Sequence, residues 1–480
     1  MPTHRVSPHA AGVAAALLLA IAGPVSTHAQ QCPGPVASYV VRQAGPDLFQ
    51  VQATFHVPTR QLGVRFSEAV GRPEAQAASV LQLEGRAGDR PVAAPYVGEG
   101  RWSAAEPLTT ARYQLRADHD QVRWADGGGD EVGSHFGDTY FFVGNAFFLI
   151  DAGWPACPVE VAFDLPAGWS ILSPWSGAAG RYVAREPATL AKNAFAIGRF
   201  RPGCADAGTM RLEWVIDERL ATARPRIEAT LSRLPRAFHD FFGRTPADRY
   251  AVIVLQGPHM DGGAFRQSFT LQLSDPVRET DAIVWSHGLA HEMLHLWLGN
   301  SVRGTDAGQV SWFTEGFTDY LAITLGYRAG LFDEGMLQQR LANVVRRVRL
   351  APRLSRDHGL VEAGTHKDDN WELIYGGGAM VALLLDAEHH DGFVAALRDL
   401  VAHAETPYTQ ADLLARMDAH THGAATRAFT AVNDGLDFGA IISRLGAAGL
   451  EVTGFSPDEV YVRFAGNCTE ARCVPAFLRR

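Results

Sequence analysis

Residues 281–300 decide the fold and read DAIVWSHGLAHEMLHLWLGN. Apolar residues recur along this segment at helical spacing, and its final Gly-Asn pair is typical of a helix end, so the whole run is predicted to be one helix. His291 and His295 lie four residues apart, which places both imidazoles on one helix face, where they can bind a single cation. Glu292 lies beside them and can reach a water molecule on that cation. The alternative is a solvated His-Glu-His face, which would need no further partner.

A second segment offers such a partner, because residues 312–320 read WFTEGFTDY. A catalytic zinc site takes three protein ligands and keeps its fourth position open. Glu315, early in a second amphipathic helix, is predicted to be the third ligand, and Zn²⁺ is the predicted cofactor. Asp319, one turn further on, is placed to accept the free N–H of a ligating histidine and fix its tautomer. His287, one turn before the first ligating histidine, is expected to be a solvated or packing residue.

The N-terminus has the pattern of a secretory signal peptide over residues 1–29. A short positive region precedes the apolar run Ala10–Val25, and the small residues Thr27 and Ala29 follow. The alternative, a membrane anchor, is disfavoured because the run is short for a span and polar sequence follows at once. We therefore expect cleavage after Ala29, a periplasmic or extracellular location, and no membrane span in the mature chain.

Length and composition describe an ordinary globular protein. A chain of 480 residues with 47% apolar residues is expected to form two or three domains with large cores. The formal net charge is −9 and basic residues do not cluster, so no nucleic-acid partner is expected; the oligomeric state is left open.

The five cysteines fit an oxidising compartment. No CxxC pair occurs, so a cysteine-based metal site is not expected. Cys468 and Cys473 could close a small loop, and Cys157 and Cys204 could form a second bridge, leaving Cys32 unpaired. Sequence alone does not fix this pairing.

Two kinds of pattern divide the mature chain. Residues 30–203 show alternating and short apolar runs separated by Gly, Pro and Asp clusters, which predicts an all-β, sandwich-like N-terminal domain. Residues 204–400 mix long helical patterns with buried strands. Because they carry the HExxH segment and Glu315, they are predicted to be the zinc metallopeptidase catalytic domain. Residues 401–480 are predicted to be a C-terminal helical region with a short cysteine-containing tail. The expected strands are 49–55, 139–143, 159–163, 250–255 and 269–273, and the expected helices are 217–242, 281–298, 312–325, 333–348 and 375–389.

At this point the chain resembles the glycyl aminopeptidase family of zinc metallopeptidases, in the gluzincin group that uses HExxH plus a downstream Glu. The segments that carry the likeness are 291–297 (HEMLHLW), 312–320 (WFTEGFTDY), 262–268 (GGAFRQS), 375–386 (YGGGAMVALLLD) and 163–169 (FDLPAGW). The resemblance implies a multidomain protein with a leading β-domain, a thermolysin-like α+β catalytic domain, and a peptide or protein substrate.

The resemblance also implies further site residues. Gly262 and Gly263 would lie on the strand that lines the substrate cleft, although a simple turn is the alternative. Tyr375 would donate to the oxyanion of the tetrahedral intermediate, although a buried core tyrosine is the alternative. The three glycines after Tyr375 suggest that another backbone approaches closely there or that the segment is a mobile hinge. The alternative is a loosely formed start of the helix.

The chain departs from the family beside the Gly-Gly pair. Members usually show Gly-Gly-x-Glu-His there, whereas the Glu and His positions of this chain are Phe265 and Arg266. In related aminopeptidases an acidic residue near this loop holds the substrate's α-ammonium, so amino-terminal specificity does not carry over directly. Asp261 or another carboxylate could substitute. Many members carry a C-terminal PDZ domain that begins with a Gly-Leu-Gly-type sequence. The C-terminus of this chain lacks such a sequence and is shorter than a PDZ domain.

The predicted function is that of an exported zinc metallopeptidase that hydrolyses peptide bonds, with Glu292 as the catalytic base. One alternative is a catalytically silent metal-binding or scaffold protein of the same fold. Another is a hydrolase of a non-peptide substrate that uses the same activated water. Exopeptidase and endopeptidase activity are both compatible with the sequence.

Overall fold

The structure is a computed structural model of the 480-residue chain. The chain from Pro35 to Arg480 packs as one compact unit, and the predicted divisions at 203/204 and 400/401 stay predictions. The described residues are 32–67, 73–117, 133–257, 260–274, 277–278, 281–435, 437–454, 456, 459–465 and 474–479. The predicted signal peptide lies outside them. Among the helices within these ranges, none is both long and apolar enough to cross a bilayer.

The N-terminal part contains two β-sheets. The larger has nine strands in the order β11-β12-β9-β1-β2-β6-β3-β4, with β5 paired to β6, and the smaller has the order β10-β13-β8-β7. The larger sheet consists of β1 (Ala37–Gly45), β2 (Leu48–Gly63), β3 (Val80–Ala87), β4 (Arg90–Val92), β5 (Tyr96–Gly98), β6 (Arg101–Arg116), β9 (Val159–Asp164), β11 (Ser176–Ala178) and β12 (Arg181–Ala184). The smaller consists of β7 (Ser134–Phe136), β8 (Thr139–Val143), β10 (Ser170–Leu172) and β13 (Ala194–Gly198), and the short helices are α1 (Gly144–Phe147) and α2 (Pro187–Ala191).

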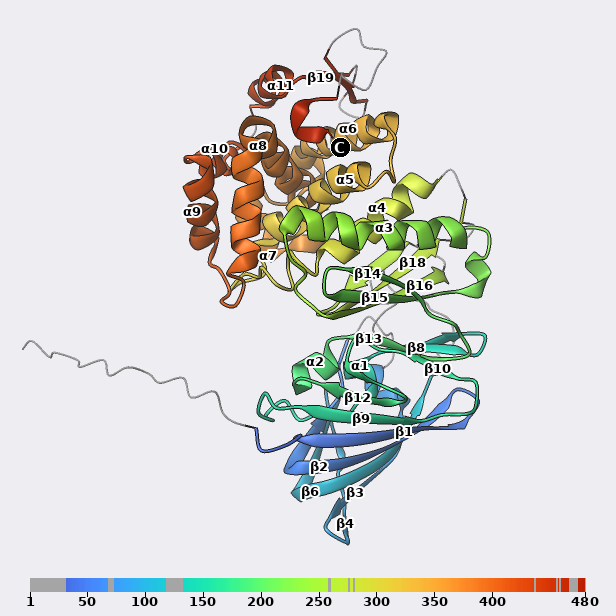
Figure 1. The fold of residues 1–480 in the computed structure, drawn as a ribbon. Coiled ribbons are helices and arrows are strands. Elements are labelled where there is room, and N and C mark those ends of the chain that lie inside the picture. The colour runs from blue at the N-terminus through green and yellow to red at the C-terminus, as the bar shows by residue number, and fades with distance from the viewer. Residues whose placement is uncertain are drawn as a thin grey trace, which may run out of the picture. The chain divides into compact units, whose positions relative to one another are not determined.

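Buried aromatic side chains join the two sheets face to face. Phe49 of β2 lies 5.2 Å from Tyr140 and 5.5 Å from Phe142 of β8, between ring centroids. Phe163 of β9 lies 6.1 Å from Phe195 of β13. These contacts, which lie between the sheets labelled in Figure 1, confirm the predicted sandwich-like architecture.

A mixed five-stranded sheet follows, in the order β14-β15-β16-β18-β17. Strands β15, β16 and β18 run parallel, and the edge strands β14 and β17 are antiparallel to their neighbours. One face packs on α3 and α4 within the main hydrophobic core, and the other face packs on the four-stranded sheet. The elements are β14 (Gly203–Ala207), β15 (Met210–Ile216), α3 (Arg224–Phe242), β16 (Arg249–Gly257), β17 (Asp261–Ala264), β18 (Ser268–Ser274) and α4 (Ala282–Leu294). Two of these strands, β16 and β18, were predicted.

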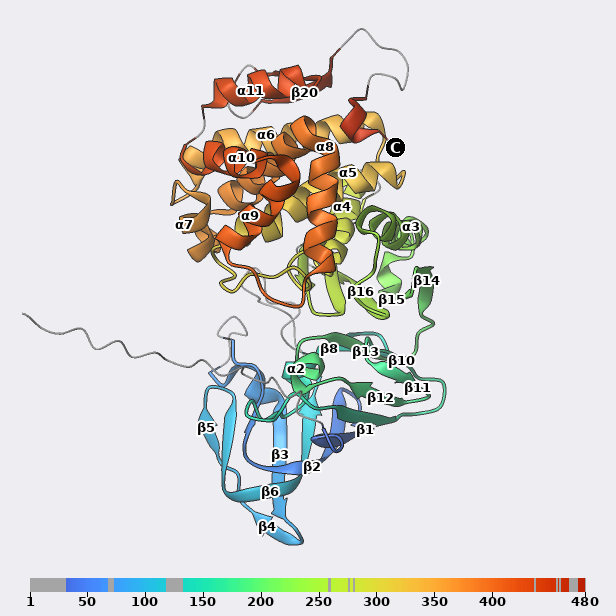
Figure 2. The ribbon, with the colours of Figure 1, turned by 60° about the vertical axis from the view of Figure 1, so that its left-hand side comes forward.

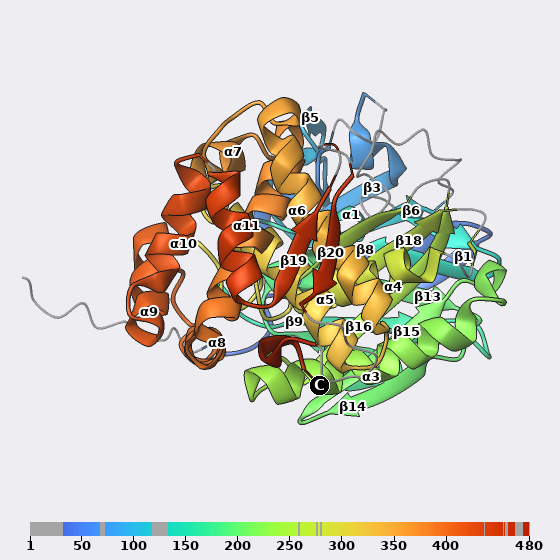
Figure 3. The same cartoon turned by 90° about the horizontal axis from the view of Figure 1, so that it is seen from above.

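Helices form most of the remaining chain, with α9 and α10 beside α8 (Figure 2). They are α5 (Thr318–Arg328), α6 (Glu334–Leu354), α7 (Leu360–Thr365), α8 (Gly378–Ala402), α9 (Gln410–Thr421), α10 (Ala424–Asn433) and α11 (Phe438–Ala447). Two π-helical turns, Trp312–Phe317 and Glu372–Gly377, lead into α5 and α8. A hairpin that the sequence did not predict, β19 (Leu450–Thr453) and β20 (Tyr461–Phe464), packs against α11 and α6 (Figure 3).

Helix α4 is shorter than predicted. It ends at Leu294 with His295 as its C-cap, so the prediction of one helix as far as Leu298 is wrong. The three residues after His295 are all buried, and the indole N–H of Trp297 donates to the Arg244 carbonyl at 2.8 Å. Burial of this apolar group turns the chain inward and ends the helix.

The structure corrects the predicted cysteine pairing. Cys157 is disulfide-bonded and buried, whereas Cys204 is free and exposed, so a Cys157–Cys204 bridge is wrong. Cys204 lies on the edge strand β14 at a position that faces solvent. Cys32, which was expected to be unpaired, is disulfide-bonded. Cys468 and Cys473 lie outside the described residues.

Candidate metal centre and substrate cleft

The two histidines of the HExxH segment lie side by side at the end of α4. His291 is in its last turn and His295 is its C-cap, and both are almost fully buried, at 7% and 8% exposure. Their Nε2 atoms are 3.1 Å apart. His295 Nδ1 donates to the Leu298 carbonyl at 3.0 Å, because a carbonyl can only accept. The inward turn after α4 therefore leaves the lone pair of His295 on Nε2, as a metal ligand requires.

Glu315 completes a triangle with these two nitrogens. Its Oε2 lies 3.4 Å from Nε2 of His291 and 3.4 Å from Nε2 of His295. Ligand atoms bound to a tetrahedral zinc at roughly 2.0–2.1 Å are about 3.3–3.4 Å apart. Two imidazoles and one carboxylate at these separations therefore fit three corners of a zinc tetrahedron. The structure brings the three predicted ligands together.

Close backbone packing places Glu315. Its π-helical turn rests on the start of α8, where Gly316 faces Gly378. A Cβ on Gly378 would lie 2.8 Å from the Trp312 carbonyl carbon and 3.0 Å from Gly316 Cα, both well inside an ordinary carbon–carbon contact of about 3.5–4.0 Å. Close approach, rather than a loose helix start, therefore explains the glycine at 378. Such π-helical turns occur frequently at functional sites.

Asp319 supports the site from behind. Its Oδ1 lies 2.7 Å from His287 Nε2 and 3.6 Å from His291 Nδ1. Asp319 therefore contacts His287 more closely than the ligating histidine it was predicted to orient. The His287 side chain is only 12% exposed, so it is not solvated, and this burial lowers its pKa to about 4 against the opposing effect of Asp319. His287 is therefore neutral near pH 7, and Asp319, whose pKa is held well below its usual range, carries the negative charge beside both histidines.

The pKa values of the two glutamates, Glu292 and Glu315, are shifted in opposite directions. Burial raises the pKa of Glu292, and the two histidines only partly offset this effect. A raised pKa suits a carboxylate that accepts and returns a proton near neutral pH. Burial acts in the same sense on Glu315, but the histidines and the Lys367 ammonium outweigh it and hold the pKa of Glu315 well below its usual range. Glu315 therefore remains an anion suited to bind a metal.

A cleft of about 1260 Å³ opens over these groups. Glu292 lines it, and so does Gly262 on the edge strand β17. A Cβ on Gly262 would lie 2.7 Å from Glu292 Oε1, so the missing side chain leaves room for that carboxylate. Gly263, the next residue of the strand, does not contribute to the cleft wall.

Tyr375 lines the same cleft although it is only 8% exposed. Its ring stacks on Trp371, with centroids 4.6 Å apart, and on its other neighbour His291 at 5.8 Å. Burial raises the pKa of the phenol, and the carboxylates of Glu315 and Glu292 raise it further. The phenol is therefore protonated at neutral pH and can donate a hydrogen bond into the cleft.

Comparison with known proteins agrees with this geometry. Residues 286–372 match the sequence model of the M61 glycyl aminopeptidase family. The resemblance to that family is confirmed. The fold is similar to that of an aminopeptidase N family protein from Idiomarina loihiensis, with a TM-score of 0.70 and 17% identity over 87% of this chain and 79% of that chain. It is also similar to an M1 zinc metallopeptidase from Deinococcus radiodurans, a mutant bound to a Tyr-Ser-Ala substrate, with a TM-score of 0.54 and 17% identity over 83% of this chain and 92% of that chain. A search of curated proteins found no match. The match to the M61 family, together with the two imidazoles and the carboxylate that could bind a metal, supports a metallopeptidase.

The positions at which the chain departs from the M61 pattern lie away from the cleft wall. Arg266 pairs with Glu186, the residue before α2, and the Phe265 carbonyl accepts from Asn300 Nδ2 at 2.6 Å. Neither residue therefore takes the place of an acid that would hold an α-ammonium. Asp261 does line the cleft, next to the Gly-Gly pair.

Several cleft residues were missed by reasoning from the sequence. Lys367 Nζ donates to Glu315 Oε1 at 2.7 Å. Met260, Val284 and Trp371 line the cleft with 39%, 45% and 49% of their surface exposed. Only the lysine carried a signal in the sequence, because the chain has 43 basic residues and only two of them, Lys192 and Lys367, are lysines.

Proposed function

We propose that the chain is an exported, zinc-dependent peptidase that hydrolyses peptide bonds in this cleft. The observation that carries the proposal is the triangle formed by Nε2 of His291, Nε2 of His295 and Oε2 of Glu315, with separations of 3.1, 3.4 and 3.4 Å. Glu292 and an open cleft lie beside it. The M61 family match over residues 286–372 supports the same activity.

The chain's own residues divide the chemistry between them. Bound zinc supplies a Lewis acid that polarises the scissile carbonyl and lowers the pKa of water toward neutrality. Glu292, whose pKa is raised by burial, takes the proton of the attacking water and passes it to the leaving amine. Tyr375, kept protonated in the cleft wall, donates a hydrogen bond to the oxyanion that develops on the substrate.

The edge strand β17 provides a way to hold the substrate backbone. Among the strands that the structure describes it pairs with β18 alone, so its other edge is offered to an extended peptide that adds as a further strand. Gly262 lets such a peptide pass close to Glu292, because no side chain stands between them. The scissile bond is thereby brought toward the base.

Hydrolysis by the purified mature chain tests the proposal. We expect zinc-restored cleavage of a peptide library that is abolished by a chelator. Glu292→Gln should lower kcat by roughly 10²–10⁴-fold, the range for loss of a general base, without changing zinc content. Glu405→Gln, at an exposed glutamate outside the cleft, is the matched control. Unaltered activity of Glu292→Gln would falsify the assignment of the base.

The same preparation separates the remaining possibilities. Cleavage of peptides with free but not blocked amino termini identifies an aminopeptidase, and sensitivity of that preference to Asp261→Asn identifies the group that holds the α-ammonium. Equal cleavage of both peptides identifies an endopeptidase. Zinc binding without cleavage of any peptide contradicts the proposal and leaves a scaffold protein or a hydrolase of other substrates.

Export is tested by sequencing the N-terminus of the secreted chain, which should begin at Gln30.

A further inference from the structure

Lys367 contacts the half of the Glu315 carboxylate that does not face the histidines. Its Nζ donates to Oε1 at 2.7 Å, while Oε2 lies 3.4 Å from each of the two Nε2 atoms. The two oxygens therefore have separate partners. The Glu315 side chain is only 12% exposed. Loss of the lysine would therefore remove a hydrogen-bond donor from a largely buried, charged oxygen, which is energetically costly.

Two aromatic rings hold the ammonium in place. Lys367 Nζ lies 5.6 Å from the Trp371 ring centroid and 5.5 Å from that of Tyr375, within the range of cation–π attraction. Because these two rings stack on each other, they form one rigid surface beneath the lysine. The ammonium therefore contacts the carboxylate and this aromatic surface at the same time.

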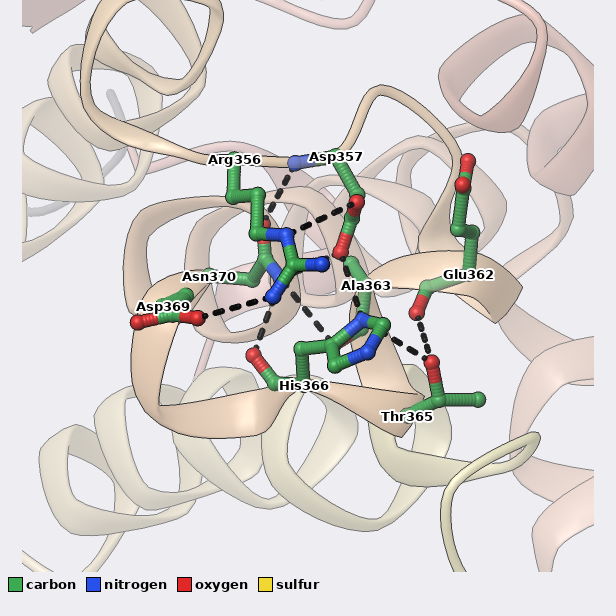
Figure 4. A network of polar contacts seen from close by, with 8 residues as sticks. All are labelled: Arg356, Asp357, Glu362, Ala363, Thr365, His366, Asp369 and Asn370. Carbon is green, nitrogen blue, oxygen red and sulfur yellow. Dashed lines mark hydrogen bonds and ion pairs between the residues drawn. The ribbon is translucent and has the colours of Figure 1, made fainter.

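The loop that carries Lys367 is built around a buried amide (Figure 4). Asn370 is fully buried and donates from Nδ2 to Asp357 Oδ2 at 2.8 Å and to the His366 carbonyl at 2.9 Å. Its Oδ1 accepts from the backbone N–H of Asp357 at 2.9 Å. The Arg356 guanidinium adds an ion pair to Asp369 at 3.3 Å. These contacts tie both ends of the loop together, so Lys367 is presented from a fixed base.

The choice of lysine is unusual for this chain. Of 43 basic residues only two are lysines, and one of them touches the carboxylate of the metal triangle. An ammonium is a compact point charge that contacts one oxygen, whereas a guanidinium favours two-pronged contact with both oxygens of a carboxylate. A lysine therefore leaves Oε2 free where an arginine would tend to engage it.

We propose that Lys367 is a positioning residue that holds Oε1 of Glu315, so that the carboxylate offers the metal a single, oriented oxygen. The inference deepens the proposed function, since it presumes that the triangle binds zinc. Lys367 acts through Glu315. A group that orients a metal ligand typically contributes 10–100-fold to metal affinity.

A purely electrostatic role predicts the opposite sign. The ammonium repels a divalent cation, so removing it would tighten binding if charge alone mattered. Its side chain is 36% exposed, and solvent weakens that repulsion. Orientation of the ligand therefore outweighs repulsion in our proposal, and the direction of the change in affinity decides between the two roles.

The experiment measures the zinc dissociation constant of the mature chain by competition with a chromophoric chelator. Lys367→Met keeps an unbranched side chain as long as the lysine's hydrocarbon part and removes the ammonium donors, and we expect it to raise the dissociation constant by roughly 10–100-fold. Lys367→Arg restores a donor and should recover part of the loss. Lys192→Met, at the other lysine, is the matched control and should bind zinc as the natural chain does. Urea unfolding of the metal-free variants shows that each is folded.

A second measurement uses the natural chain and needs no variant. Its two lysines can be labelled with ¹³C-methyl groups and followed by NMR. Addition of zinc should shift the Lys367 signal and leave that of Lys192 in place. Unchanged or tighter zinc binding by Lys367→Met, or a Lys367 signal that ignores zinc, overturns the proposal. All of these readouts are independent of peptide cleavage, whereas the proposed function itself fails if the natural chain binds no zinc or cleaves no peptide.

Discussion

The contact between Gly316 and Gly378 makes a quantitative prediction about the substitution Gly378→Ala. Gly378 has ordinary helical angles, φ −62° and ψ −42°, so alanine meets no backbone penalty there. Its new methyl group would collide with the Trp312 carbonyl oxygen, and it would lie 2.8 Å from the Trp312 carbonyl carbon and 3.0 Å from Gly316 Cα. Relieving the collision with the oxygen and restoring carbon–carbon contacts of about 3.5–4.0 Å requires the two backbones to separate by roughly 1 Å or more.

Two consequences follow from that separation. Overpacking costs about 1–3 kcal/mol, and the upper end applies because backbone atoms obstruct the methyl group; the helix preference of alanine returns about 1 kcal/mol. We therefore expect a net loss of roughly 2 kcal/mol in the free energy of unfolding. The turn that moves carries Glu315, and a functional site tolerates displacements of only about 0.5 Å, so zinc affinity should fall as well.

Gly377→Ala is the matched control. Gly377 is also helical, but its added methyl would meet side chains, of which the Leu360 Cδ2 atom at 2.8 Å is the nearest. A leucine can rotate where a backbone cannot, so this variant should stay within about 1 kcal/mol of the natural chain. Urea unfolding and chelator competition measure both variants. If Gly378→Ala matches Gly377→Ala in stability and in zinc affinity, the packing argument is wrong.

Two further substitutions test other parts of the structure. Tyr375→Phe should lower kcat by roughly 10²–10³-fold with little change in KM or zinc affinity, as expected for loss of one oxyanion donor, and an unchanged kcat would assign Tyr375 to the core alone. Asp399→Asn tests a charge outside the cleft: the hydrogen bond from Arg416 Nε, 2.6 Å long, holds the pKa of Asp399 below its usual value. The stability that this carboxylate contributes is present above its unfolded-state pKa and is lost as the pH falls through its folded-state pKa. In urea unfolding, Asp399→Asn should therefore be less stable than the natural chain at about pH 7. The difference between the two should shrink near pH 3.

The parts of the site that were predictable from the sequence depend on local spacing. Histidines four residues apart share a helix face wherever the helix packs, and His291 and His295 do so. Glu315 was identified because a metal with two imidazole ligands needs a third donor, and the segment after α4 offered one with helical flanks. Alternating apolar residues likewise located β2, and short apolar runs located the buried strands β16 and β18.

What the sequence did not show depends on contacts between distant segments. The end of α4 is decided by burial of the residues after His295, which no helix-stop signal records. The state of Cys204 depends on which face of an edge strand it occupies. Lys367 reaches Glu315 across 52 positions of sequence, on a loop whose shape is fixed by the buried amide of Asn370. Such pairings become visible only when the chain is folded.

The exposed apolar side chains of the cleft bear on which peptides this chain would favour. Met260, Val284 and Trp371 leave hydrocarbon surface in contact with water around a polar centre. A substrate residue that covers such surface gains about 25 cal/mol for each square ångström withdrawn from solvent. A glycine, with no side chain, withdraws almost none, whereas a leucine or phenylalanine withdraws much more. If peptides bind in this cleft, its wall would therefore favour large apolar residues over small ones, before any bond is broken.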